Sequence, residues 1–425
     1  MDEVKRQRTS NTLLAVALVA MLSLFVGYTP TLEAAPLEII YWHTYTDQHE
    51  AGLLRIIEGF NNSQDQYKVV PQQQPYGEFD AKLMQAVRIG VGPDMVNMFA
   101  SDAINYISND LLVDLAPYIN DPAHGISSFK ENMNQGLYAE ITQWGEDSIY
   151  LFPFTMTGEV LFYNKTIFDK YDLEAPTTWT ELEEASKVIY ENEGIPGFGS
   201  DSITDTYQGL IMQAGSGYID ADTKTMQIDE AIAKEKLEWF TEGVNAGYFR
   251  LVGEDVYFSN PFGSQAVASY IGSSAGVSYV ELAVGDAFEI GCVPIPQEGP
   301  VKYISQWASS LVCLSRDDEH ARGVYEYFKY LSSTDVLADW ATVLGSIPVF
   351  YDAVQTDKMQ QYVSENMAAK ALVAEMEYAG MLSSIPGSHN VRTEIDKMVQ
   401  RVALGVMDVD SAYEAFIQAS QNAIR

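Results

Sequence analysis

Short apolar runs alternate with amphipathic stretches along the chain after about residue 37. Strands are expected at 37–43 (LEIIYWH), 67–71 (YKVVP) and 95–99 (MVNMF). The first stretch between them has apolar residues at helical spacing, with Ala51, Leu54, Ile57 and Phe60 on one face. The second has Phe79, Leu83, Met84 and Val87 at the same spacing. Strands that alternate with helices of this length predict βαβ units and a mostly parallel sheet.

The same alternation continues beyond residue 150. Further strands are expected at 160–163, 266–271, 288–294 and 310–314. Thr178 and Glu181 form a capping box that opens a helix, and a later helix should end near Gly247. The last third is predicted to be mainly helical, at about 317–333, 334–344, 356–380, 390–405 and 409–424. No internal repeat or low-complexity linker interrupts the pattern, so we expect the chain to cross between its domains more than once.

The longest apolar run, residues 13–28, follows the basic segment MDEVKRQR and precedes small residues near Ala35. This arrangement is typical of a secretory signal peptide, so residues 1–35 are predicted to direct export and to be removed. An uncleaved N-terminal anchor is the alternative, because a run of this length falls just short of a membrane span. The absence of a cysteine next to the run argues against a lipid anchor and favours a periplasmic protein.

Composition narrows the class of protein. About 390 residues would remain after cleavage, which is too long for one core and natural for two domains. The formal net charge of −34 argues against binding nucleic acid, whose phosphates require positive charge. The chain carries 26 Tyr, 18 Phe and 6 Trp, and side chains with a flat apolar face and a polar edge suit stacking against sugar rings.

Metal and nucleotide chemistry have little support. The two cysteines, Cys292 and Cys313, and the five scattered histidines show no zinc-site spacing. A disulfide and two buried thiols are both compatible with the cysteine positions. The glycine-rich segment 90–94 lacks the Lys-Ser/Thr of a phosphate-binding loop. We therefore expect no cofactor and no metal.

One motif suggests an enzyme. Residues 272–276 read GSSAG and match the G-x-S-x-G nucleophile elbow, with Ser274 at its centre and His389 downstream. An exported α/β-hydrolase is therefore an alternative function. The other interpretation is a turn of small residues whose amides and hydroxyls face a binding cleft. A glycoside hydrolase has no specific support, since 59 acidic residues provide carboxylate pairs by number alone.

Several segments together resemble the extracellular solute-binding proteins of sugar-importing ABC transporters, in the maltose- and glycerol-phosphate-binding group. The matching segments, in order, are 40–43 (IYWH), 92–96 (GPDMV), 147–154 (DSIYLFPF), 160–165 (VLFYNK) and 176–179 (PTTW), with looser matches at 268–276, 291–296 and 345–348. The resemblance implies an α/β fold of the two-lobed periplasmic binding protein type (type II), with two mixed sheets flanked by helices and a multi-crossing hinge. It implies an N-terminal lobe of 37–152 plus 297–341 and a C-terminal lobe of 153–296 plus 342–425.

The resemblance also implies a ligand-binding site in the cleft between the lobes. The residues carried over are Trp42, His43, Tyr45, Asp47, Tyr76, Phe79, Ser101, Asp102, Phe154, Thr155, Thr157, Ser273, Ser274, Trp307 and Ser346. Trp42 and Trp307 are the preferred stacking platforms. Asp47 and Asp102 would accept hydrogen bonds from neighbouring hydroxyls of a sugar.

One departure from the family pattern bears on the ligand. Members that bind glycerol phosphate hold the phosphate with an arginine, and here Arg392 is shifted and expected to face the exterior of a helix. A neutral sugar or oligosaccharide is therefore favoured over a phosphate. The sequence predicts a non-enzymatic, monomeric periplasmic receptor that captures a sugar and delivers it to an ABC permease.

Overall fold

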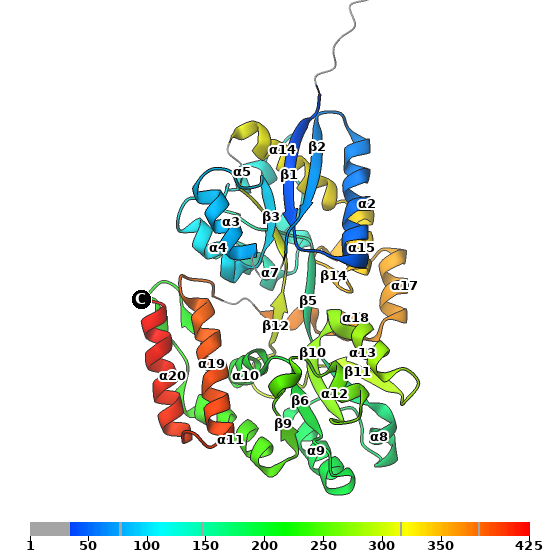
Figure 1. Cartoon of the computed structure of the whole chain (residues 1–425), viewed down its shortest axis with the longest axis vertical. Coiled ribbons are helices and arrows are strands. Elements are labelled where there is room, and N and C mark those ends of the chain that lie inside the picture. The colour runs from blue at the N-terminus through cyan, green and yellow to red at the C-terminus, as the bar shows by residue number, and fades with distance from the viewer. Residues whose placement is uncertain (1–34, 76–78, 146–147, 315–316, 381–382) are drawn as a thin grey trace, which may run out of the picture. The chain divides into compact units, whose positions relative to one another are not determined.

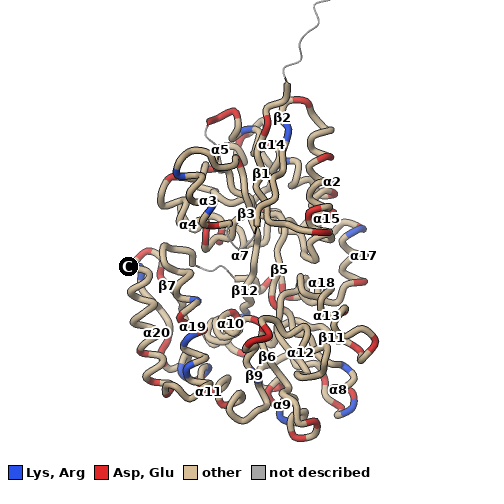
Figure 2. Tube along the Cα trace, in the orientation of Figure 1, with Lys and Arg blue, Asp and Glu red and all other residues tan. Residues whose placement is uncertain are grey.

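The computed structural model describes residues 35–75, 79–145, 148–314, 317–380 and 383–425. Residues 38–425 form one compact unit, shown in Figure 1. The predicted signal peptide, except Ala35 itself, and Tyr76 lie outside the described residues. Asp and Glu positions recur along the whole trace and outnumber Lys and Arg (Figure 2).

Two mixed sheets carry the fold. The smaller has the strand order β2 (Tyr67–Gln73), β1 (Leu37–His43), β3 (Met95–Met98), β13 (Ser310–Cys313), β4 (Phe152–Pro153). β1 and β3 are parallel, whereas β13 runs antiparallel to both β3 and β4. The sheet is therefore parallel in its βαβ part, as predicted, and antiparallel where the chain returns to it after residue 300.

The larger sheet is built around the long strand β5 (Thr155–Asn164). Its main order is β15 (Ala379–Gly380), β12 (Ile304–Trp307), β5, β10 (Ser269–Ser273), β6 (Phe198–Ser200), β9 (Phe249–Arg250), and β11 (Ile290–Pro294) and β14 (Ile347–Pro348) also pair with β5. A separate hairpin joins β7 (Ile219–Asp220) to β8 (Thr225–Met226). Cys292 on β11 and Cys313 on β13 belong to different sheets and do not form a disulfide.

Helices surround both sheets (Figure 1). Those of the segments around the smaller sheet are α2 (Asp47–Ser63), α3 (Phe79–Arg88), α4 (Ala100–Ile107), α5 (Ala116–Ile119), α6 (Phe129–Asn132), α7 (Gln135–Ile141), α14 (Asp318–Leu331) and α15 (Thr334–Val343). The remaining α-helices are α8 (Lys165–Lys170), α9 (Trp179–Glu193), α10 (Ile203–Gln213), α11 (Glu230–Ala246), α12 (Ser259–Gly263), α13 (Val277–Val284), α16 (Tyr351–Val354), α17 (Asp357–Glu365), α18 (Met367–Glu375), α19 (Ser388–Ala403) and α20 (Val409–Ala423). The described residues also include the 3₁₀ turns η2 (Gly253–Asp255), η3 (Ser274–Gly276) and η4 (Met376–Tyr378).

Local sequence signals explain several helix boundaries. The Thr178 side chain accepts from the Glu181 amide, and the Glu181 carboxylate accepts from the Thr178 amide, so the predicted capping box opens α9. Gly247 ends α11 with a φ of 95°, a conformation that glycine adopts without a Cβ clash. The predicted face of α2 was wrong in part, since Ala51 and Leu54 are exposed. The core of α2 is formed by Leu53, Ile56, Ile57 and Phe60 instead.

The chain crosses between the sheets three times. β4 in the smaller sheet continues directly into β5 in the larger one, and β12 in the larger sheet continues into β13 in the smaller. The third crossing leads from α15, which contacts α2, to β14, which pairs with the start of β5. The predicted α/β class with two mixed sheets and a multi-crossing hinge is confirmed. The exact bounds of the lobes remain a prediction.

Candidate functional site

A cavity of about 840 Å³ lies at the strand crossings, and we call it the large cavity. Its aromatic lining consists of Tyr45, Phe79, Phe99, Tyr106 and Trp307. Its polar lining consists of Thr44, His49, Asp80, Asn97, Asp102, Asn105, Thr155, Thr157, Ser309 and Ser346. The mixture of flat rings, hydroxyls, amides and carboxylates is typical of a site that orients a polar small molecule.

Strand ends and helix starts position these side chains. Thr44 and Tyr45 follow β1, and Asn97 lies on β3 just before α4 begins. Parallel strands end at the same edge of their sheet, so segments distant in sequence meet there. The first residues of β5 and the last residue of β12, Trp307, complete the wall from the larger sheet. Thr157 is tied to this strand end, since its hydroxyl donates to the Trp307 carbonyl at 3.4 Å.

The structure brings seven of the fifteen predicted residues to one cavity. Those that line the large cavity are Tyr45, Phe79, Asp102, Thr155, Thr157, Trp307 and Ser346. Ser346 is 1 % exposed and its hydroxyl donates to the Ala341 carbonyl at 3.2 Å. Ser101 lines a smaller neighbouring cavity.

The predicted residues of the first strand fall outside the cavity lining, apart from Tyr45. Alternation along β1 buries His43, which is 1 % exposed and packs on Tyr45 with ring centroids 6.2 Å apart. Trp42 lies on the opposite face, where its indole nitrogen donates to Gln72 at 2.9 Å and the Lys82 ammonium lies 5.0 Å from its ring centroid. Asp47 is exposed at the first residue of α2.

Three further predicted residues have structural contacts instead of a place in the lining. Phe154 is 2 % exposed and packs on Phe152, with ring centroids 6.3 Å apart. Ser273 caps η3, since its hydroxyl accepts from the Ala275 amide at 3.4 Å. Ser274 is 1 % exposed, and its hydroxyl accepts from the Gly158 amide at 3.5 Å. The Gly-Ser-Ser-Ala-Gly segment is therefore a strand-to-3₁₀ turn that packs against β5.

The hydrolase alternative receives no support from this geometry. Ser274 lines neither cavity, whereas His389 lines the smaller one. No group of three or more His, Cys, Asp or Glu side chains within the described ranges is arranged to hold a metal ion.

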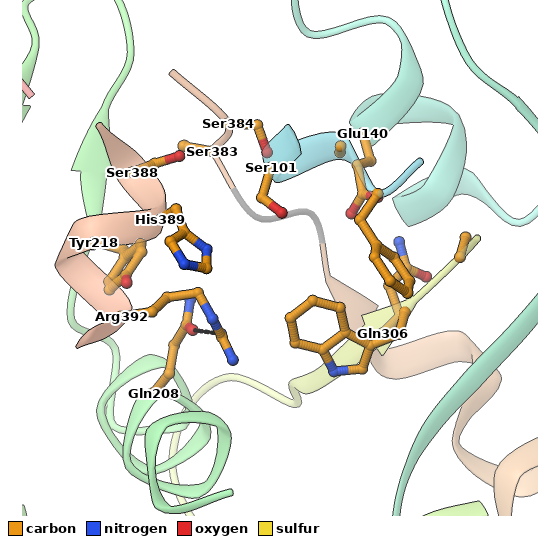
Figure 3. A pocket seen from close by; sticks show the side chains of 14 residues that line it. Ser101, Glu140, Gln208, Tyr218, Gln306, Ser383, Ser384, Ser388, His389 and Arg392 are labelled. Atoms are coloured by element: carbon orange, nitrogen blue, oxygen red, sulfur yellow. Dashed lines mark hydrogen bonds between the residues drawn. The ribbon is translucent and has the colours of Figure 1, made fainter. Parts of the chain in front are cut away.

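A second cavity of about 30 Å³, which we call the small cavity, adjoins the large one, and both are lined by Phe99 and Trp307. The other lining residues are Ala100, Ser101, Glu140, Gln208, Tyr218, Gln306, Ala308, Ser383, Ser384, Ser388, His389 and Arg392. Figure 3 shows α19, with Ser388, His389 and Arg392, and α10, with Gln208, on one side and the strand of Gln306 on the other. Phe99 and Trp307 meet edge to face, with ring centroids 5.7 Å apart.

Arg392 corrects one expectation from the sequence. It does not face the exterior of its helix, because its side chain is only 19 % exposed and points into the wall of the small cavity. Its two terminal nitrogens donate to the Asp205 carboxylate at 2.9 and 3.0 Å. The guanidinium carbon lies 4.7 Å from the Trp307 ring centroid, so Arg392 also stacks against the tryptophan that the cavities share.

Acidic side chains outnumber basic ones around both cavities, and burial disfavours the charged form of two of them. Burial raises the pKa of Asp102, and Asp80 raises it further, while His389 lowers it. Burial raises the pKa of Glu159 well above its usual value, with Asp205 and Asp201 adding to the effect. Among the described lining residues of the two cavities, Arg392 is the one lysine or arginine, and its charge is matched by Asp205.

Of the polar side chains of the small cavity, Ser101 was predicted as a site residue, whereas Gln208, Tyr218 and Gln306 were missed. Gln208 lies in the middle of α10, and Tyr218 follows the end of that helix. Gln306 directly precedes Trp307 on β12, a strand that the apolar pattern did not predict. The position of Gln306 next to Trp307 was the available signal, because adjacent residues of a short strand can both lie near the same site.

The fold consists of two mixed β-sheets, flanked by helices and joined by three chain crossings, with an aromatic and polar cavity at the crossings. These features define a two-lobed ligand-binding protein. Residues 55–369 match the bacterial extracellular solute-binding proteins, and the chain belongs to this family. The family match supports the solute-binding interpretation and gives no support to the hydrolase alternative. In the part of the chain that the structure describes, no helix has the length and apolarity needed to cross a membrane.

Relatives and solved structures agree with this assignment. The chain is 24 % identical over 415 residues to the sn-glycerol-3-phosphate-binding periplasmic protein UgpB of Rhizobium meliloti, covering 88 % of this chain and 95 % of the relative. It superposes on a cyclic alpha-maltosyl-1,6-maltose binding protein of Arthrobacter globiformis with a TM-score of 0.80, at 19 % identity and 92 % and 99 % coverage. It superposes on UgpB of Mycobacterium tuberculosis in complex with glycerophosphocholine with a TM-score of 0.74, at 16 % identity and 92 % and 98 % coverage. These likenesses establish the two-lobed periplasmic binding protein fold.

Proposed function

We propose that this protein captures a neutral sugar or oligosaccharide in the large cavity and delivers it to an ABC permease, without making or breaking a bond. It would act as a monomer in the periplasm, with residues 1–35 as its export signal. The observation that carries the proposal is the lining of the large cavity, where aromatic rings alternate with hydroxyl, amide and carboxylate groups.

The chemistry of this lining suits a carbohydrate. Aromatic faces stack on the apolar faces of sugar rings, and carboxylates and amides bind the hydroxyls at the ring edge. Trp307 and Phe79 supply rings, while Asp80, Asp102 and Asn97 supply hydrogen-bonding groups. A volume of about 840 Å³ falls in the range of small-molecule sites, which is roughly 300–1,000 Å³.

The charge of the site favours a neutral ligand over a phosphate. A phosphate is held best by a cation whose charge is not already matched, and the Arg392 guanidinium is paired with both oxygens of the Asp205 carboxylate. The lining carboxylates Asp80, Asp102 and Glu140 would repel an anion. The competing candidate is a phosphorylated glycerol, because the names of the relatives specify glycerol 3-phosphate.

Capture would proceed by closure of the lobes. A ligand that binds the walls contributed by both sheets stabilises the closed form, and the closed form is what a permease would recognise. The three crossings at β4–β5, β12–β13 and α15–β14 would act as the hinge. Trp307 lies at the β12–β13 crossing, so a ligand that stacks on its ring would contact the hinge directly.

A ligand panel tests the proposal directly. Thermal unfolding of the mature chain should be followed with maltose, maltotriose, D-tagatose, sn-glycerol 3-phosphate and glycerophosphocholine. A neutral sugar at 100 times its Kd should stabilise the fold by about 2.7 kcal/mol. Stabilisation by the two phosphates alone would overturn the neutral-ligand proposal, and turnover of an ester that Ser274→Ala abolishes would overturn the non-enzymatic one.

A further inference from the structure

Three buried side chains of the small cavity have polar atoms with no hydrogen-bond partner in the protein. They are the Gln208 amide nitrogen, both polar atoms of the Gln306 amide, and the Tyr218 hydroxyl. The three residues are 0 %, 2 % and 9 % exposed. They come from α10, β12 and the segment before β7, and Figure 3 labels them around one cavity. Separate elements therefore bring unused donors and acceptors to the same place.

Buried polar side chains in this region differ in this respect. The hydroxyls of Tyr303 and Ser305 also have no partner but line neither cavity, whereas other buried side chains are fully bonded within the protein. Gln213, also on α10 and 0 % exposed, donates to the Pro296 and Tyr303 carbonyls and accepts from Trp179 and the Glu298 amide. Tyr207 is likewise 0 % exposed, and its hydroxyl donates to the Ala233 carbonyl at 2.8 Å. A buried polar group left without a partner destabilises the fold, because it loses its bonds to water and gains none. The grouping of three such residues around one cavity therefore indicates that they serve a ligand.

The size of the cavity limits what can enter. One water-sized group occupies about 10–15 Å³ measured with a water-sized probe, so about 30 Å³ accommodates roughly two such groups. A whole sugar ring is too large, whereas a hydroxymethyl group or two neighbouring hydroxyls fit. The remainder of the ring would stay in the large cavity against Trp307, which lines both spaces.

The chemistry of the cavity points to hydroxyls. Amide and phenol groups both donate and accept, as hydroxyls do, and these carry no charge. The cation beside them, Arg392, is neutralised by Asp205 and donates to the Gln208 amide oxygen at 3.4 Å. We propose that the small cavity is a specificity subsite that binds the hydroxyl-bearing edge of a neutral sugar through Gln306, Tyr218 and Gln208. This inference rests on the proposed function and deepens it.

The first test uses variants matched in chemistry and burial. Gln306→Met and Tyr218→Phe each remove unused polar groups, so either change should weaken binding of a sugar from the panel at least tenfold. The melting temperature of the free protein should stay the same or rise. The controls Gln213→Met and Tyr207→Phe remove groups with partners, so they should lower the melting temperature and leave Kd within about twofold. Calorimetric titration with maltose, maltotriose and D-tagatose supplies Kd.

The outcomes separate the two proposals. If the wild-type chain binds a sugar and neither Gln306→Met nor Tyr218→Phe weakens that binding, the subsite proposal is wrong. The proposed function would remain unaffected by that result. If the wild-type chain binds none of the sugars, the proposed function fails, and crystals soaked in glycerol then examine the subsite alone. Glycerol hydroxyls bound to Gln306 and Tyr218 in the wild type, and absent in Gln306→Met, would support it. Isolated waters in both crystals would overturn it.

Discussion

The large and small cavities share Trp307 and Phe99 but differ in how their polar groups are used. In the large cavity, several polar side chains are already partnered, such as Ser346 with Ala341 and Asn97 with Ser309. In the small cavity, the amide of Gln306 and the hydroxyl of Tyr218 have no protein partner. The large cavity therefore provides most of the contact area, the stacking rings and some hydrogen-bonding groups, whereas the small one provides polar groups that the protein itself leaves without partners.

This difference predicts which cavity should determine affinity for the ligand and which should determine selectivity between ligands. Stacking on aromatic rings tolerates many sugars, because most ring faces are alike. Unused donors and acceptors reject a ligand that leaves them unpaired, since the cost of burial is then not recovered. We expect changes in the large cavity to weaken all ligands, and changes in the small cavity to alter which ligand is preferred.

The largest effect on the molecule should come from Arg392→Met, which removes one member of a buried ion pair. The Arg392 and Asp205 side chains are 19 % and 4 % exposed. Loss of one partner leaves a buried charge uncompensated, so the free energy of unfolding should fall by about 3–5 kcal/mol. Chemical denaturation of the ligand-free protein measures this.

Two variants sharpen that result. In Arg392→Met combined with Asp205→Asn, both charges are absent, so most of the lost stability should return. Lys397→Met breaks an ion pair with Glu394 on the same helix, where Lys397 is 48 % exposed, and should cost less than about 1 kcal/mol. Equal costs for Arg392→Met and Lys397→Met would contradict the view that the wall of the small cavity is built on a buried ion pair.

The next largest effect should come from Trp307→Ala, because Trp307 belongs to both cavities. Removal of its ring takes away the stacking surface and also the partner of the Arg392 guanidinium. Affinity for a panel sugar should fall at least tenfold, or about 1.4 kcal/mol, by calorimetric titration. Trp239→Ala is the control, since Trp239 bonds to Glu183 and lines neither cavity. An unchanged Kd in Trp307→Ala would remove this tryptophan from the site.

Most of the fold could be predicted from the sequence because its signals are local. The apolar runs before residue 100 and the helical spacing of the last third placed strands and helices within a few residues. The predicted helix at 356–380 is divided instead, because Asn366 ends α17 and its side chain caps α18. β12 was missed since its four residues carry a polar pair, Ser305 and Gln306, that gives no strand pattern.

The candidate site could be predicted only in part, and only through the family resemblance. The residues that the resemblance implies and that line the large cavity are Tyr45, Phe79, Asp102, Thr155, Thr157, Trp307 and Ser346. Gln208 and Arg392 lie inside helices, and which face of a helix meets a cavity depends on packing against other segments. Arg392 faces inward because Asp205 on α10 accepts its charge, and that pairing joins positions 187 residues apart.

The pH dependence of stability tests Asp201, an acidic residue that directly follows β6. Burial raises the pKa of Asp201 to about 6, although a hydrogen bond from the Phe258 amide opposes the shift. A carboxyl whose pKa is higher in the folded state stabilises the fold when protonated. Its contribution is complete below the unfolded pKa near 3.8 and is lost as pH rises through about 6.

Asp201→Asn isolates this contribution, because the asparagine oxygen can still accept from Phe258. Between pH 4 and pH 7, the wild type should lose on the order of 1 kcal/mol more of its free energy of unfolding than the variant. Denaturation series at several pH values measure the difference. Parallel curves for the two proteins would show that Asp201 titrates as an ordinary surface acid.

The smallest effect should come from Trp42→Ala, and it completes the comparison with Trp307. The sequence suggests the two tryptophans as equal platforms, yet Trp42 lines neither cavity. Its indole bonds to Gln72 on the neighbouring strand β2 and lies beneath the Lys82 ammonium, so its contacts are structural. Kd for a panel sugar should change by less than about twofold, or 0.4 kcal/mol. A tenfold loss would mean that closure of the lobes brings Trp42 to the ligand, and the site would then extend beyond the large cavity along β1.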